Sequence, residues 1–94
     1  MIKGFADGAT EKVWQRRRSK VVPADLQRKA LQKLAQIHYA EDLNDLRVPP
    51  GNRLEKLSGD REGQHSIGIN RRYRICFVWE DGDAYGVEIV DYHK

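Results

Sequence analysis

Several features that would point to a particular class of protein are missing from this chain of 94 residues. Cys76 is the only cysteine, so no internal disulfide can form and a reducing compartment is expected. No apolar run approaches the roughly 18 residues of a membrane span. The first residues, MIKGFADG, also lack the long apolar segment of a secretory signal. These absences predict a cytoplasmic protein with no membrane partner.

Motifs for cofactor-assisted chemistry are absent too. No glycine-rich phosphate loop precedes a predicted helix, so we expect no nucleotide cofactor. The three histidines, His38, His65 and His93, are scattered rather than spaced as zinc ligands, and no metal site is expected. Ser58 and Ser66 lack the surroundings of an activated nucleophile. Any reaction of this chain should therefore proceed without cofactors.

Positive charge is what the sequence does contain, in a chain of net charge +3 and pI about 9.2. It gathers in two clusters. The first holds Arg16, Arg17, Arg18 and Lys20, and the second holds Arg71 and Arg72. Clustered cations attract phosphate chains, so the charge is compatible with binding to nucleic acid, although many ordinary proteins carry a similar excess. For the first cluster alone, the solvated end of a helix remains the more ordinary explanation.

The order of patterns predicts helices first and strands afterwards. Residues 2–5 could form an initial strand, and Asp7 suits the N-cap of a helix over 9–18. An apolar stripe predicts a second helix after Pro23, with its members Leu26, Ala30, Leu34 and Ile37 buried and Arg28, Lys29, Gln32 and Lys33 facing outward. Strands are expected at 53–57, 65–70, 72–79 and 84–92, the last two joined by a hairpin. We predict a single α+β domain over 1–94, with two helices on one face of a mainly antiparallel sheet.

Side chains alternate between the two faces of the last two predicted strands, and this alternation places ionisable groups where the core should end. One face of each strand should be apolar: Tyr73, Ile75, Phe77 and Trp79, and then Val87 and Ile89. Asp91 and His93 continue that second row, while Tyr92 follows Glu88 and Val90 on the opposite face. The end of the last strand should therefore overhang a groove.

These terminal groups suit the cleavage of RNA, in which the ribose 2′-OH serves as the nucleophile. His93 could move protons near neutral pH, and Asp91 could orient it or act as a base. Tyr92 offers a ring for a base to stack on, and Arg74 a fork for a phosphate. Ordinary alternatives remain: Arg74 could pair with Asp91 or Glu88, His93 could be a frayed end, and Tyr92 a simple surface aromatic.

Residues 52–93, NRLEKLSGDREGQHSIGINRRYRICFVWEDGDAYGVEIVDYH, resemble the HigB branch of the RelE/ParE toxin superfamily. The successive landmarks GDREG, YRICF, DGDAY and the final DYH carry the resemblance. It implies a βααβββ-type fold and a metal-independent, ribosome-dependent endonuclease that cuts mRNA in the A site. It also implies a helix-turn-helix antitoxin of the HigA type as partner, with operator DNA bound only through that antitoxin. The family's catalytic positions fall on Arg74, Asp91, Tyr92 and His93.

The chain departs from the family pattern at three positions. Some relatives carry a histidine and a lysine where Glu55 and Ser58 stand here, and Lys56 and Arg61 are the nearby cations that could replace them. Many relatives have arginine at the position of Gly68. We hypothesise an attenuated toxin in which Gly68→Arg raises cleavage. A second hypothesis is a binder of antitoxin and another target without catalysis, and a third is a ribonuclease that needs no ribosome.

Overall fold

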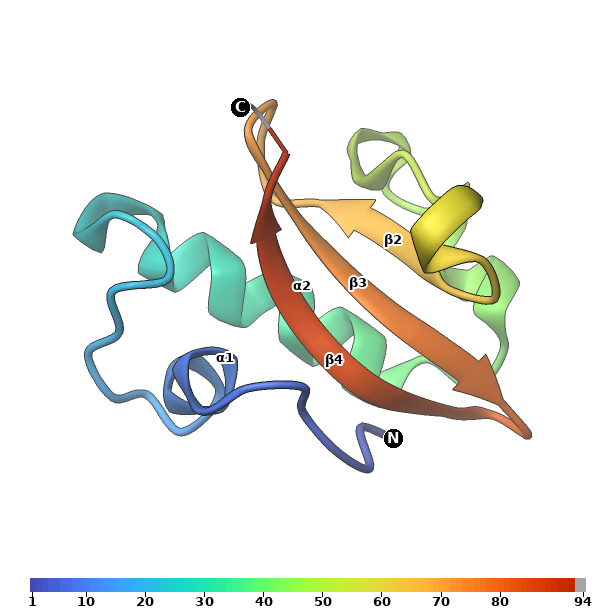
Figure 1. The fold of residues 1–94 in the computed structure, drawn as a ribbon, viewed down its shortest axis with the longest axis horizontal. Helices are drawn as coiled ribbons and strands as arrows, with labels where there is room; N and C mark the ends of the chain where they lie inside the picture. The colour runs from blue at the N-terminus through green and yellow to red at the C-terminus, as the bar shows by residue number, and fades with distance from the viewer. Residues whose placement is uncertain (93–94) are drawn as a thin grey trace.

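The computed structural model describes residues 1–92 and places two helices against one face of a four-stranded antiparallel sheet (Figure 1). The helices are α1 (Gly8–Trp14) and α2 (Gln27–Tyr39), and the strands are β1 (Glu55–Lys56), β2 (His65–Gly68), β3 (Tyr73–Glu80) and β4 (Asp83–Asp91). Short 3-10 turns, η1 (Ala24–Leu26), η2 (Leu43–Arg47), η3 (Pro50–Asn52) and η4 (Gly59–Arg61), connect them. The α+β class predicted from the sequence is confirmed. No helix within residues 1–92 is long and apolar enough to cross a membrane.

The N-terminal segment lies beside β4 but forms no full strand, contrary to expectation. Ile2 and Phe5 make isolated parallel bridges to Ala84 and Val87. Asp7 then caps α1 as predicted, because its Oδ1 accepts a hydrogen bond from the Thr10 amide at 2.8 Å.

Helix α1 is shorter than the pattern suggested. It ends at Trp14 rather than continuing to Arg18. Arg16 has a φ of 63°, in the left-handed region that no helical residue adopts. The arginines of the first cluster consequently lie in the irregular connection between α1 and α2.

Helix α2 buries three of the four members of the predicted stripe, together with one residue expected to face solvent, while the fourth member, Leu26, lies in η1 and is only partly buried. Ala30, Leu34 and Ile37 are fully buried. Lys33 was predicted to point outward, and that was wrong: it is 8% exposed, and its Nζ donates to Oδ1 of Asn52 at 2.5 Å. Burial, with a smaller contribution from the charge of Lys29, lowers the pKa of Lys33. The reason is tertiary, since η3 folds over α2 and supplies the partner.

Asn52 connects this lysine to the segment before β1. Its Nδ2 donates to Oε1 of Gln36 at 2.9 Å and to the carbonyls of Leu46 and Val48 at 3.2 and 3.4 Å. Asn52 is completely buried, so its amide joins α2, η2 and η3 away from solvent. The network fixes the start of β1, which borders the site described below.

The strands follow one another in the order β1-β2-β3-β4, each antiparallel to the next. Asp81 and Gly82, with φ of 52° and 83°, form the tight turn between β3 and β4, as the sequence predicted. The register pairs Tyr73 with Asp91 and Arg74 with Val90.

The predicted division of the sheet into two faces is confirmed where burial tests it. The face against the helices holds the fully or nearly fully buried Ile67, Ile75, Phe77, Val87 and Ile89. Arg74 and Cys76 alternate with these residues along β3 and belong to the opposite face. That second face, which no helix covers, carries the polar side chains of the site.

Candidate functional site

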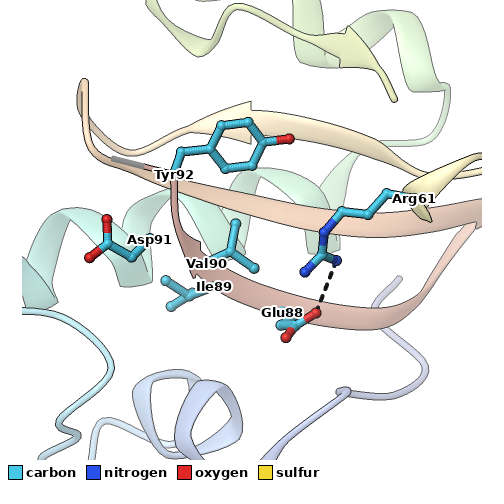
Figure 2. Close-up of a pocket in the computed structure, with 6 residues that line it drawn as sticks. All are labelled: Arg61, Glu88, Ile89, Val90, Asp91 and Tyr92. Carbon is cyan, nitrogen blue, oxygen red and sulfur yellow. Dashed lines mark hydrogen bonds and ion pairs between the residues drawn. The ribbon is translucent and has the colours of Figure 1, made fainter. Parts of the chain in front are cut away.

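Two adjoining hollows lie between the end of β4 and the β1–β2 loop (Figure 2). The larger, about 540 Å³, is lined by Arg61, Glu88, Ile89, Val90, Asp91 and Tyr92. The smaller, about 280 Å³, is lined by Glu55, Lys56, Leu57, Ser58, Asp60, Arg61 and Tyr92. Because Arg61 and Tyr92 line both, we treat the two hollows as one and call it the groove.

Tyr92 presents an exposed ring on a fixed backbone. Its amide donates to the carbonyl of Arg72 at 2.7 Å, which holds the residue directly after β4 in place. The side chain is 46% exposed. Figure 2 shows the ring on the same side of β4 as Arg61. An aromatic ring held in this way is a suitable platform for stacking an unpaired base.

Arg61 reaches across the groove to β4. Its Nη1 lies 3.1 Å from Oε1 of Glu88, and the same nitrogen donates to Oε1 of Gln64 at 3.1 Å (Figure 2). Burial alone would lower the pKa of Arg61, but the hydrogen bond and charge of Glu88 outweigh it and raise that pKa. The structure thus places Arg61 and Lys56, the two cations named from the sequence, on the groove beside Tyr92.

Arg74 lies beneath the surface of the site rather than open to it. It is 6% exposed, and its Nε donates to Oγ of Ser66 at 2.9 Å. Its Nη2 donates to the carbonyl of Arg53 at 2.6 Å and lies 3.3 Å from Oε1 of Glu55. Its ionic partner is therefore Glu55, not Asp91 or Glu88 as the alternative suggested.

Glu55 is a member of the site that the sequence did not predict. We had counted it as a departure from the family pattern, yet its half-exposed carboxylate lines the groove and is held by Arg74. Glu88 was missed as well, although alternation along β4 placed it on the same face as Tyr92. For Glu55 no signal existed in the sequence, since its position depends on how β1 pairs with β2.

Asp91 points away from the groove, although its backbone lines it (Figure 2). Arg72 holds its carboxylate: Nε lies 3.1 Å from Oδ1, and Nη2 lies 2.8 Å from Oδ2. This hydrogen bond and the charge of Asp91 raise the pKa of Arg72. His93 lies outside the described residues. The structure therefore brings Tyr92 to the groove, and assigns Asp91 a partner on the opposite side of β4.

Members of both basic clusters lie beside Tyr73. Arg16, Arg17, Arg18 and Lys20 are all exposed, as are Arg71 and Arg72. Arg18, Lys20 and Tyr73 line a third hollow, of about 470 Å³, and the guanidinium carbon of Arg72 lies 5.3 Å from the centre of the Tyr73 ring. Arg18 and Lys20 of the first cluster and Arg72 of the second thus lie near Tyr73, which pairs with Asp91 at the end of β4, whereas Arg16 lines a different hollow against α2.

The structure changes what is expected of Gly68→Arg. A Cβ at Gly68 would lie 3.1 Å from Nη1 of Arg74, which Ser66 and Arg53 anchor through its other nitrogens. The buried guanidinium must therefore give way by a few tenths of an ångström, a movement that these anchors oppose. We expect the variant to lose about 1–3 kcal/mol of unfolding free energy, as overpacked sites do, and to gain no cleavage activity.

Thermal unfolding together with mRNA cleavage checks this expectation. Gly51→Arg is the matched control, because a Cβ there meets nothing within 4 Å. Faster cleavage by Gly68→Arg at unchanged stability would instead support attenuation through a missing basic side chain.

Comparison with known proteins identifies the family to which this chain belongs. Residues 3–93 match the family described as RelE-like toxin of type II toxin-antitoxin system HigB. Toxin HigB-1 of Vibrio cholerae serotype O1 is 38% identical over 78 residues, which cover 83% of this chain and 81% of that protein. Endoribonuclease HigB of Proteus vulgaris is 32% identical over 93 residues, or 99% and 100% of the two chains.

The fold is also found in solved structures. A chain of the heterotetrameric YoeB–YefM toxin–antitoxin complex from Staphylococcus aureus superposes with a TM-score of 0.58 at 18% identity, covering 100% of this chain and 97% of that one. At this identity the likeness concerns the fold, which is that of RelE-like toxins. The match over residues 3–93 and the two HigB relatives show that this chain belongs to the HigB family of RelE-like toxins of type II toxin–antitoxin systems.

Proposed function

We propose that this toxin is an endoribonuclease that cleaves mRNA in the A site of the ribosome. The observation that carries the proposal is the groove, where the exposed ring of Tyr92 lies beside the cations Arg61 and Lys56 and the carboxylate of Glu55. The name of the Proteus vulgaris relative, Endoribonuclease HigB, supports the same activity.

The chemistry requires only that the protein orients RNA and moves protons. The 2′-oxygen attacks the adjacent phosphorus, the bond to the 5′-oxygen breaks, and a cyclic phosphate remains. Tyr92 stacks the base, and Arg61 and Lys56 offset the charge that develops on the phosphate. Glu55, oriented by the buried Arg74, accepts the proton of the 2′-OH. His93 donates a proton to the leaving oxygen, and Asp91 with Arg72 holds the strand end that carries it.

We infer that cleavage depends on the ribosome, because the groove offers few side chains to align an RNA substrate. Much of the substrate's alignment must come from elsewhere, and ribosomal RNA can provide it. The exposed cations of the two basic clusters, namely Arg16, Arg17, Arg18, Lys20, Arg71 and Arg72, would contact ribosomal phosphates, so binding should weaken as salt rises. Outside translation, a helix-turn-helix antitoxin of the HigA type would bind this toxin, and operator DNA would be reached only through that antitoxin.

The test is primer extension on a purified mRNA, with and without translating ribosomes. We expect cuts within translated codons only when ribosomes are present, and a strong loss with His93→Ala. Equal cleavage of free mRNA would refute the dependence on ribosomes. Absence of cleavage by the folded parent protein would favour the alternative, a toxin that binds antitoxin and another target without cutting RNA.

A further inference from the structure

The ion pair between Arg61 and Glu88 occupies the groove that the proposed function assigns to RNA. Arg61 comes from η4 and Glu88 from β4, so the pair connects the β1–β2 loop to the strand that ends at Tyr92. Both side chains are partly open to water, at 33% and 30% exposure. Neither is sealed in the core, and the contact can exchange with solvent.

Glu88 and an RNA phosphate would use the same donor. A guanidinium binds carboxylates and phosphates through the same N–H groups. Among the described lining of the larger hollow, Arg61 is the only cation, while Glu88 and Asp91 supply acids. The Asp91 side chain points away from the groove and is paired with Arg72. A phosphate entering beside Tyr92 therefore meets Arg61 with Glu88 already bound to it.

We propose that Glu88 is an affinity-setting residue, which occupies Arg61 until a phosphate of the bound RNA strand replaces its carboxylate. The inference rests on the proposed RNA-binding role of the groove. Each binding event opens the ion pair, so part of the attraction between Arg61 and the phosphate offsets the lost contact with Glu88. Binding would then be weaker, and less sensitive to salt, than the cations of the groove alone would make it.

Glu88→Gln separates this role from a structural one. The amide keeps the shape of the side chain but no longer competes as an anion. We expect about two- to fivefold tighter binding, the range that partly exposed ion pairs account for. The slope of log K against log salt should become more negative, by at most about 0.7, the value for one phosphate on a single strand, because no released carboxylate is left to attract a cation. A merely structural Glu88 would give weaker binding and an unchanged slope.

The probe is a ribosome programmed with mRNA that carries a 2′-O-methyl group at the cleavage position, so that binding is measured by co-sedimentation without reaction. Glu80→Gln, an exposed acid at the far end of β3, is the matched control and should bind as the parent does. In an Arg61→Gln background the gain from Glu88→Gln should disappear, because no guanidinium remains to be released.

Each outcome bears on a stated claim. Tighter, more salt-sensitive binding that requires Arg61 supports the role of Glu88. If Glu88→Gln tightens binding equally with and without Arg61, the acid only repels the RNA, and the proposed role of Glu88 is overturned. Unchanged or weaker binding by Glu88→Gln would overturn that role as well. If the parent cleaves translated mRNA while Glu88→Gln behaves like it, this inference fails alone. If the folded parent neither binds programmed ribosomes nor cleaves, the proposed function fails and this inference with it.

Discussion

Asn52→Ala is expected to lower the unfolding free energy by about 3 kcal/mol. The side chain is completely buried, accepts from Nζ of Lys33 at 2.5 Å, and donates to Gln36 and to two backbone carbonyls. Alanine removes every one of these bonds and leaves the nearly buried ammonium of Lys33 without its hydrogen bond to Asn52. An unpaired buried polar group costs about 1–3 kcal/mol, more when charged.

Thermal unfolding measures this directly, with a fall in Tm of about 15 °C for a domain of this size. Asn44→Ala, an exposed asparagine in η2, should stay within about 0.5 kcal/mol of the parent. When Lys33 is first changed to methionine, Asn52→Ala should cost clearly less, since no buried charge is abandoned. An equal cost in both backgrounds would mean that the lysine contact contributes nothing.

Tyr92→Ala should slow cleavage of ribosome-bound mRNA by about a hundredfold while leaving the melting temperature almost unchanged. Stacking of one base on an aromatic ring is worth about 1–3 kcal/mol, and loss of a hydrogen bond from the hydroxyl to the bound RNA adds to that. The ring is 46% exposed and its backbone bond to Arg72 does not depend on the side chain, so the fold should not suffer.

Tyr92→Phe divides that loss into its parts. It keeps the ring and removes the hydroxyl, and we expect a decrease of about tenfold, between the parent and the alanine variant. Single-turnover cleavage on programmed ribosomes gives both rates. Tyr39→Ala, which truncates a side chain that is 77% exposed on α2, should leave the rate unchanged. Parent-like cleavage by Tyr92→Ala would remove Tyr92 from the site.

The sequence predicted the two sheet faces because alternation in β3 and β4 is local and strong. It placed the groove on the face of Asp91, however, whereas the groove lies on the face of Glu88 and Tyr92. It could not predict that Lys33 is buried, because the partner, Asn52, lies in a segment whose path over α2 depends on tertiary packing. The predicted end of the first helix, at residue 18, was also wrong, since no residue type in 15–18 indicates that Arg16 adopts a left-handed conformation.

The ionic partners were the least predictable part of the site. Arg74 was expected near a phosphate or beside Asp91, whereas it is buried and contacts Glu55. Asp91 is paired with Arg72 from the β2–β3 connection. These pairings depend on which strands lie side by side and on where long side chains bend. Spacing along one strand determines neither, so the residue types at the site were predictable and their partners were not.

The first residues of the chain protect the sheet against uncontrolled strand addition. The outer edge of β4 would expose a row of amides and carbonyls, which in other proteins templates aggregation. Here Ala84 and Val87 donate to the carbonyls of Met1 and Gly4, and the amide of Ile89 donates to Oγ1 of Thr10. The opposite edge is only the two-residue β1. Within residues 1–92, neither edge of the sheet offers a long unpaired strand. We therefore expect other macromolecules to bind this protein through its side chains rather than by adding a strand to its sheet.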